Sequence, residues 1–118
     1  MLRKFVAVFA ISTLLAIPVV AQQGGKYSAF VAKAKYQLTR DFKDPSSAQY
    51  RNAAVYKNSD GKISLCGEVN AKNSFGAYIG FVPFYADETS HTIKQEGDDV
   101  VFPMLYRLTC ETKLSAVK

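Results

Sequence analysis

The chain has 118 residues, of which 48% are hydrophobic and 21% are charged, and its formal net charge is +5. This length predicts one small domain and excludes a multidomain organisation. The charge falls to +3 without Arg3 and Lys4, which is too small for the basic surface of a nucleic-acid-binding protein, so no nucleic-acid partner is expected.

The first 21 residues have the parts of a secretory signal peptide. Arg3 and Lys4 give a positive start to an apolar run over residues 5–20, and Ala21 is a small residue directly before an expected cut at Gln22. The run of about 16 residues is shorter than the about 20 that cross a bilayer as a helix. We therefore expect a signal peptide over residues 1–21 and one exported domain over residues 22–118, without stable membrane insertion after cleavage. An uncleaved membrane anchor is the alternative.

Two cysteines follow the expected cut, Cys66 and Cys110. In an oxidising compartment an even number of cysteines indicates a disulfide, so this pair is predicted to be bonded in a periplasmic or secreted protein. Two buried free thiols are the alternative.

The first element of the exported domain is predicted to be an amphipathic helix. Apolar residues recur at spacings of 3, 1, 3, 4 and 4, which places them on one helical face: Tyr27, Phe30, Val31, Ala34, Leu38 and Phe42. This face is expected to pack on a sheet, although a lysine-rich helix also suits a membrane surface. Asp44 and Pro45 are expected to end this helix and to begin a short helical turn.

From Ala53 the pattern changes to the period of two that is typical of strands. Residues 53–57 and 63–69 alternate on either side of the turn sequence Asn58-Ser59-Asp60-Gly61, which predicts a hairpin. Further strands are predicted over residues 76–85, 91–95 and 100–109. The last is expected to lie at an edge or to be interrupted, because it contains Pro103. Residues 111–118 show no strong pattern and are expected to fray.

These elements predict an α+β fold, with the N-terminal amphipathic helix packed on an antiparallel sheet of four to five strands. The single disulfide would tie the second strand to the last.

Two stretches are distinctive, DPSSAQYRN at residues 44–52 and LCGEVNAKNSFGAY at residues 65–78. They resemble a group of small exported and prophage-associated bacterial proteins. The resemblance implies a bacterial envelope protein, and no activity carries over with it.

The chain has little that indicates catalysis or cofactor binding. Its one histidine, His91, lies between Ser90 and Thr92, a context that is typical of a polar turn rather than of a catalytic triad. Metal ligands are too few for a zinc site once both cysteines are oxidised, and there is no glycine-rich phosphate loop. We expect a protein that is not an enzyme and that binds no cofactor and no metal.

The most informative polar residues surround the end of the second predicted strand. Glu68 shares a face with Cys66, so if Cys66 points inward, Glu68 needs a partner, and Arg51 is the candidate for a structural pair. The segment that follows this strand is too polar for burial and is a candidate recognition site. Its candidate binding residues are Lys72, Asn73, Phe75 and Tyr78.

The expected function is that of a small non-catalytic protein that binds another protein of the cell envelope. The first alternative is an inhibitor or immunity-type protein that blocks an envelope hydrolase with residues 70–78, and a small hydrolase that uses Glu68 with Arg51 is a third. A binding module should expose an apolar patch, an inhibitor should present a protruding loop, and an enzyme should have a pocket with converging titratable groups.

Overall fold

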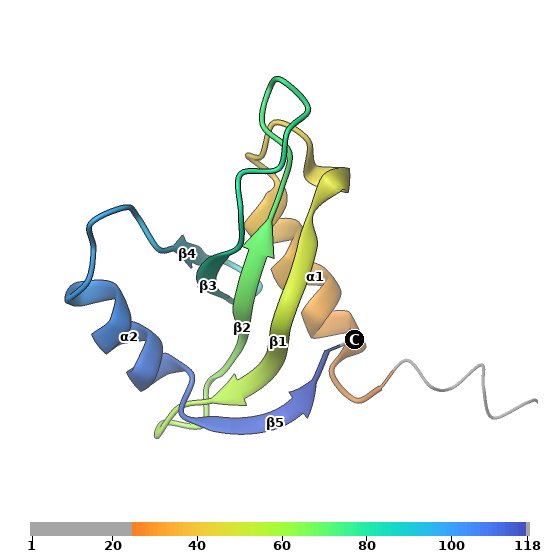
Figure 1. Ribbon diagram of the computed structural model, residues 1–118. Coiled ribbons are helices and arrows are strands. Elements are labelled where there is room, and N and C mark those ends of the chain that lie inside the picture. The colour runs from red at the N-terminus through yellow and green to blue at the C-terminus, as the bar shows by residue number, and fades with distance from the viewer. Residues whose placement is uncertain (1–24, 118) are drawn as a thin grey trace, which may run out of the picture.

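The computed structural model describes residues 25–117 as a five-stranded antiparallel sheet with two α-helices, an α+β fold (Figure 1). The expected signal peptide, residues 1–21, lies outside the described residues. The strand order is β4-β3-β2-β1-β5. The elements in chain order are α1 (Ser28–Thr39), the 3-10 turn η2 (Pro45–Ser47), β1 (Gln49–Lys57), β2 (Ile63–Asn70), β3 (Val82–Ala86), β4 (His91–Ile93), α2 (Val101–Thr109) and β5 (Thr112–Ala116). Among the described residues, no helix combines the length and the apolar character needed to cross a bilayer.

Helix α1 covers one face of the sheet and closes the hydrophobic core. Its side chains Phe30, Ala34 and Leu38 are buried against strand residues, above all Val55, Leu65 and Phe84. The predicted face is therefore the one that packs. The expected contrast between an apolar and a polar side is weak, however, because the outer side also carries Ala29, Ala32 and Tyr36, the last of which is 71% exposed.

The β1–β2 hairpin is confirmed, and its turn is held by the Asn58 side chain. Asn58 Oδ1 accepts hydrogen bonds from the backbone N–H groups of Asp60 at 3.0 Å and Lys62 at 2.9 Å. Strand β1 begins at residue 49, earlier than predicted. A bulge shifts its register between Arg51 and Ala54. A bulge interrupts the alternation of side chains, so the period of two is visible in the sequence only after it.

The predicted strand over residues 76–85 is wrong in its first half. Strand β3 spans only Val82–Ala86, and the preceding residues form a loop. Gly76 and Gly80 have φ angles of 77° and 107°, which lie outside the range of extended strands. The apolar residues of this segment have the pattern of a strand, but the φ angles of its glycines give the backbone the conformation of a loop.

The predicted last strand, residues 100–109, is instead helix α2. Phe102 and Tyr106, four residues apart, lie on the side of the helix that packs on Tyr85, with ring centroids 5.5 and 6.4 Å from that of Tyr85. Asp98 Oδ1 accepts hydrogen bonds from the first turn of the helix. Pro103 is tolerated because it stands within this first turn, where backbone N–H groups have no partner inside the helix.

The prediction that the C-terminal segment frays is wrong, because residues Thr112–Ala116 form the edge strand β5. It pairs antiparallel with β1, and Leu114 packs against the core cluster. Five residues with only one inward apolar side chain give too short an alternation to be recognised from sequence.

The predicted disulfide is present between Cys66 and Cys110. Because residues 101–109 are helical, it ties β2 to the C-terminal end of α2 rather than to a strand. Cys66 points away from α1 toward α2, so the face that it shares with Glu68 is not the face of the main core.

Candidate functional site

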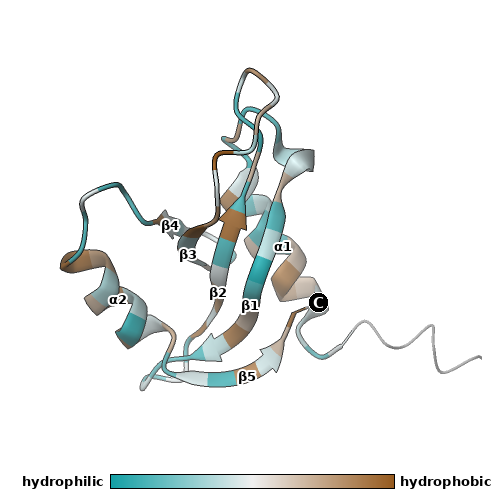
Figure 2. Ribbon diagram, viewed as in Figure 1, coloured by the Kyte–Doolittle hydropathy of each residue, from teal (hydrophilic) through white to brown (hydrophobic). Residues whose placement is uncertain are grey.

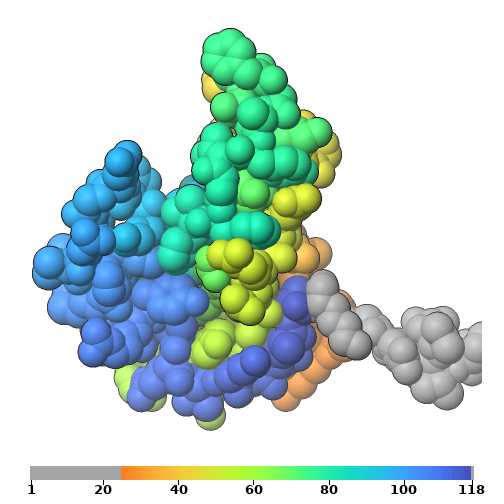
Figure 3. Space-filling model, in the orientation of Figure 1, coloured from red at the N-terminus to blue at the C-terminus, as the bar shows by residue number. Residues whose placement is uncertain are grey.

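The segment between β2 and β3, residues 71–81, projects from the end of the sheet, and we call it the projecting loop. Figures 1 and 3 show it as the part of the described chain that extends furthest from the sheet. It holds large apolar side chains in solvent: Phe75 is 94% exposed and Ile79 is 70% exposed, and Tyr78 is also exposed. A projecting element with exposed aromatic side chains is the kind of surface that protein partners contact.

The tip of the projecting loop is organised by Asn73. Asn73 Oδ1 accepts hydrogen bonds from the backbone N–H groups of Phe75 at 2.9 Å and Ala77 at 3.2 Å. The backbone of Asn73 also pairs with Ala77 and Gly76. The side-chain oxygen of this candidate binding residue is therefore engaged inside the loop, where it fixes the position of Phe75.

The base of the loop is attached to the 3-10 turn η2 through Ser47. The Tyr78 hydroxyl donates a hydrogen bond to the Ser47 carbonyl oxygen at 3.0 Å, and the backbone N–H of Lys72 donates one to Ser47 Oγ at 2.9 Å. On the other strand of the loop, Gly80 N–H donates to Asn70 Oδ1 at 3.0 Å. Ser47 thus joins the stretch at residues 44–52 to the stretch at residues 65–78, and both ends of the loop are held.

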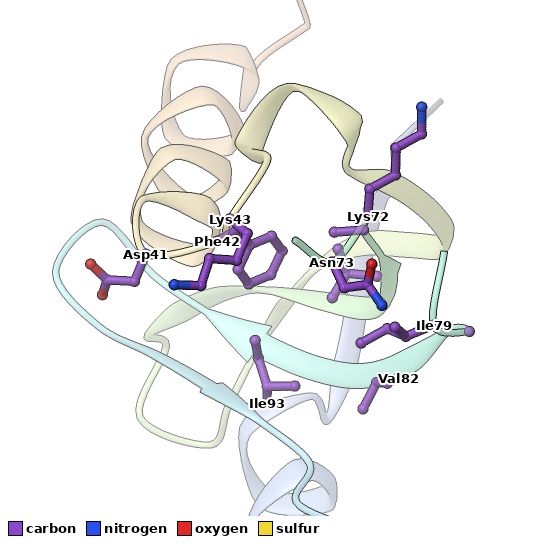
Figure 4. A pocket seen from close by; sticks show the side chains of 11 residues that line it. Asp41, Phe42, Lys43, Lys72, Asn73, Ile79, Val82 and Ile93 are labelled. Carbon is purple, nitrogen blue, oxygen red and sulfur yellow. The ribbon is translucent and has the colours of Figure 1, made fainter. Parts of the chain in front are cut away.

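An apolar hollow of about 310 Å³ lies at the base of the loop (Figure 4). Figure 4 shows the side chains of Phe42, Ile79, Val82 and Ile93 around this space, while the ammonium group of Lys72 points away from it. The other lining residues are Asp41, Lys43, Val69, Ala71, Asn73 and Gly80. The hollow can receive an apolar side chain, and it adjoins the exposed residue Ile79.

Arg51 and Glu68 lie together, as the sequence suggested, but not in a buried site. Arg51 Nη2 lies 2.6 Å from Glu68 Oε2, and Asn52 Nδ2 donates a hydrogen bond to Glu68 Oε1 at 3.2 Å. The two residues are opposite each other in the β1–β2 register. Their side chains are 54% and 26% exposed, so the expectation of a buried pair is wrong. The reason is that the face of β2 carrying Cys66 and Glu68 is covered only in part by α2.

This pairing keeps Glu68 ionised. The hydrogen bond from Arg51 lowers the pKa of Glu68, partial burial opposes this, and the hydrogen bond from Asn52 lowers it further. An ionised carboxylate whose two oxygens already accept hydrogen bonds is a poor general acid.

A second cavity, of about 600 Å³, lies between α2 and the sheet. Its charged groups are largely paired, Glu68 with Arg51, and Lys94 Nζ with Asp99 Oδ1 at 2.9 Å. His91 lines neither cavity, and among residues 25–117 no three His, Cys, Asp or Glu side chains gather as metal ligands. The cavity residues are Asn52, Gly67, Glu68, Pro83, Lys94, Phe102, Pro103, Tyr106, Arg107 and Cys110.

Replacing Glu68 with glutamine is expected to lower stability slightly, because an ion pair this exposed is screened by solvent. The effect should depend on pH. A lowered folded-state pKa means that the contribution of Glu68 is fully present above the unfolded-state pKa, about 4.3 for glutamate, and is lost as the pH falls through the folded-state value.

Urea unfolding of the wild type and the Glu68→Gln variant between pH 7 and pH 2 measures this difference, which should shrink toward zero at the acid end. Glu96→Gln is the matched control, since Glu96 is exposed and has no ion pair among the described residues. A difference that is large at pH 7 and unchanged in acid would show that Glu68 acts through packing instead.

Comparisons of the chain with protein-family models, with curated proteins and with solved structures find no match.

Proposed function

We propose that this chain is a small exported, non-catalytic protein of the bacterial envelope that binds another protein through the projecting loop and the apolar hollow. The observation that carries the proposal is Phe75, an aromatic residue that is 94% exposed at the tip of a loop whose backbone is fixed by its own hydrogen bonds. Aromatic residues are enriched among those that dominate binding energy. A loop that is already ordered loses less conformational entropy when it binds.

The disulfide supports the exported location. Bonds such as Cys66–Cys110 persist in the periplasm and outside the cell, whereas cytosolic thiols are kept reduced. The predicted signal peptide and the resemblance to exported bacterial proteins point to the same compartment.

The residues that line the apolar hollow indicate which side chains a partner would carry. Its walls are aliphatic and aromatic, and its rim carries Lys43 and Lys72 against one carboxylate, Asp41. A partner that inserts an apolar side chain with an acidic neighbour would fit both features. Phe75 would then enter the partner while the partner fills the hollow.

The projecting loop also favours a second candidate function, inhibition of an envelope hydrolase. A narrow, internally hydrogen-bonded loop with one aromatic side chain at its tip has the form of an element that enters an enzyme cleft. In this case the captured partner should lose activity when the domain is added.

The Phe75→Ser variant is expected to weaken partner binding about tenfold or more, the loss that follows from removing about 1.4 kcal/mol of interface energy. Its melting temperature should stay close to that of the wild type because Phe75 packs on nothing. The measurement is capture from a periplasmic extract, followed by a titration with the purified partner and an assay of any hydrolase activity that the partner has.

Tyr36→Ser is the control, because Tyr36 is a similarly exposed aromatic residue on α1. If the partner binds the Phe75→Ser variant as tightly as the wild type, while the control loses binding, the interface is on the outer side of α1 and the proposal fails.

A further inference from the structure

Helix α2 has an apolar side that no described element covers. Four side chains follow the spacing i, i+3, i+4, i+7 and, with one residue directly before the helix, are 39% to 77% exposed: Val100, Val101, Met104, Leu105 and Leu108. We call them the α2 stripe. The opposite side of the helix packs on the sheet through Phe102 and Tyr106. Figure 2 shows α2 at the margin of the molecule, away from the projecting loop.

We propose that a second copy of this chain covers the α2 stripe, with the two α2 helices antiparallel around a twofold axis. The spacing of the stripe produces a ridge of side chains that packs into the groove beside the same ridge on an identical helix. A twofold arrangement needs only one self-complementary patch, which a stripe centred between Met104 and Leu105 provides.

The charges at the two ends of α2 select the antiparallel orientation. The segment that enters the helix carries three carboxylates, Glu96, Asp98 and Asp99. At the other end, Arg107 and Lys113 outnumber Glu111. Antiparallel helices bring the acidic end of one copy to the basic end of the other, and their helix dipoles also oppose each other favourably. A parallel pair would bring like charges together.

Of these six charged residues, only Asp99 has an ion pair among the described residues, so charges at both ends of α2 are available for contact between copies. Asp99 is bound to Lys94, and Asp98 accepts hydrogen bonds from the start of α2. Glu96 and Arg107 form no salt bridge within the described chain. The proposed interface therefore brings Glu96 of one copy to the end of α2 that carries Arg107 and Lys113 in the other copy, and symmetry makes this approach twice.

The size of the stripe predicts a reversible dimer. Five partly exposed aliphatic side chains offer roughly 300 Å² per copy, on the scale of 60–120 Å² for a whole side chain of this size. Stable interfaces bury about 800 Å² per partner. Association should therefore depend on concentration over the range from about 10 μM to about 1 mM.

Sedimentation velocity of the mature wild-type domain over this range tests the proposal. We expect the mean mass to rise from that of a monomer toward that of a dimer. The Leu108→Glu variant should remain monomeric throughout, with an unchanged melting temperature because Leu108 is exposed. Phe75→Ser should associate like the wild type, which separates this interface from the proposed function of the projecting loop.

Charge exchange tests the orientation. Arg107→Glu alone and Glu96→Arg alone should each weaken dimerisation several-fold, and the double variant should restore it, because each helix end then carries the opposite charge and the two ends attract again. Restoration should disappear in about 1 M salt.

Three results would overturn the proposal. A double variant that associates no better than the single variants would exclude the antiparallel pair, and a Leu108→Glu variant that still dimerises would exclude the stripe. A wild-type domain that remains monomeric at about 1 mM but binds phosphatidylglycerol vesicles, and loses this binding in Leu108→Glu, would assign the stripe to a membrane surface.

Discussion

Replacement of both Cys66 and Cys110 with alanine is expected to lower the free energy of unfolding by about 4 kcal/mol, the chain-entropy estimate for a closed loop of this length. For a domain of this size the melting temperature should fall by roughly 15–30 °C. The structural reason is that the bond joins β2, at the centre of the sheet, to the end of a helix that otherwise packs on the sheet mainly through two aromatic side chains. Without the bond, α2 has few contacts to keep it in place.

Equilibrium urea unfolding measures this effect, with the wild type in its oxidised form and the double variant in the same buffer. The matched control is the double variant treated with a reductant, which should change nothing further, whereas the reductant should bring the wild type down to the level of the variant. If the wild type kept its stability after both thiols had been freed, the bond would contribute little, and packing alone would hold α2.

The Gly67→Ala variant is expected to lose about 3 kcal/mol of stability, at the upper end of what overpacking costs. A Cβ atom at Gly67 would lie 2.7 Å from Ala53 Cα and 3.1 Å from Ala53 Cβ. The closest atom belongs to the backbone of β1 beside its bulge, so it cannot turn aside as a side chain could. Asn52, with φ 54°, shows that the backbone here is already confined to an uncommon conformation.

Thermal unfolding of Gly67→Ala tests this expectation, with Gly61→Asn as the control. Gly61 has a φ of 79° and open space around its Cα, and asparagine tolerates this conformation, so the control should be nearly neutral. Adding Ala53→Gly to Gly67→Ala should give little recovery, because the clash with the Cα remains. Full recovery in that double variant would show that the methyl group of Ala53, rather than the strand backbone, excludes a side chain at residue 67.

The parts of the fold that depend on local patterns could be predicted from sequence. Helix α1 and the β1–β2 hairpin each show one periodicity over a sufficient length, and the disulfide follows from two cysteines in a chain that is expected to be exported. The Arg51–Glu68 pair could be anticipated because an unpaired carboxylate within a strand needs a partner. Its exposure could not, since that depends on how much of the sheet α2 covers.

Helix α2 was mistaken for a strand because it is apolar on two sides. Phe102 and Tyr106 pack inward while Met104, Leu105 and Leu108 point outward, so the segment lacks the polar positions that reveal a helical period. The apolar hollow lay beyond sequence reasoning for a different reason. Its walls come from the segment after α1, the end of β2, the projecting loop, β3 and β4, and only the folded chain brings Phe42, Val82 and Ile93 together.

The disulfide has a consequence for how the domain withstands proteolysis. The projecting loop lies between Cys66 and Cys110 in the chain, so it belongs to a covalent ring closed by the sulfur bridge. A protease that cut one peptide bond at the exposed tip near Phe75 would open this ring without dividing the molecule. The fragment with α1, β1 and β2 would stay bonded to the fragment with β3, β4, α2 and β5, and a nicked domain could keep its sheet.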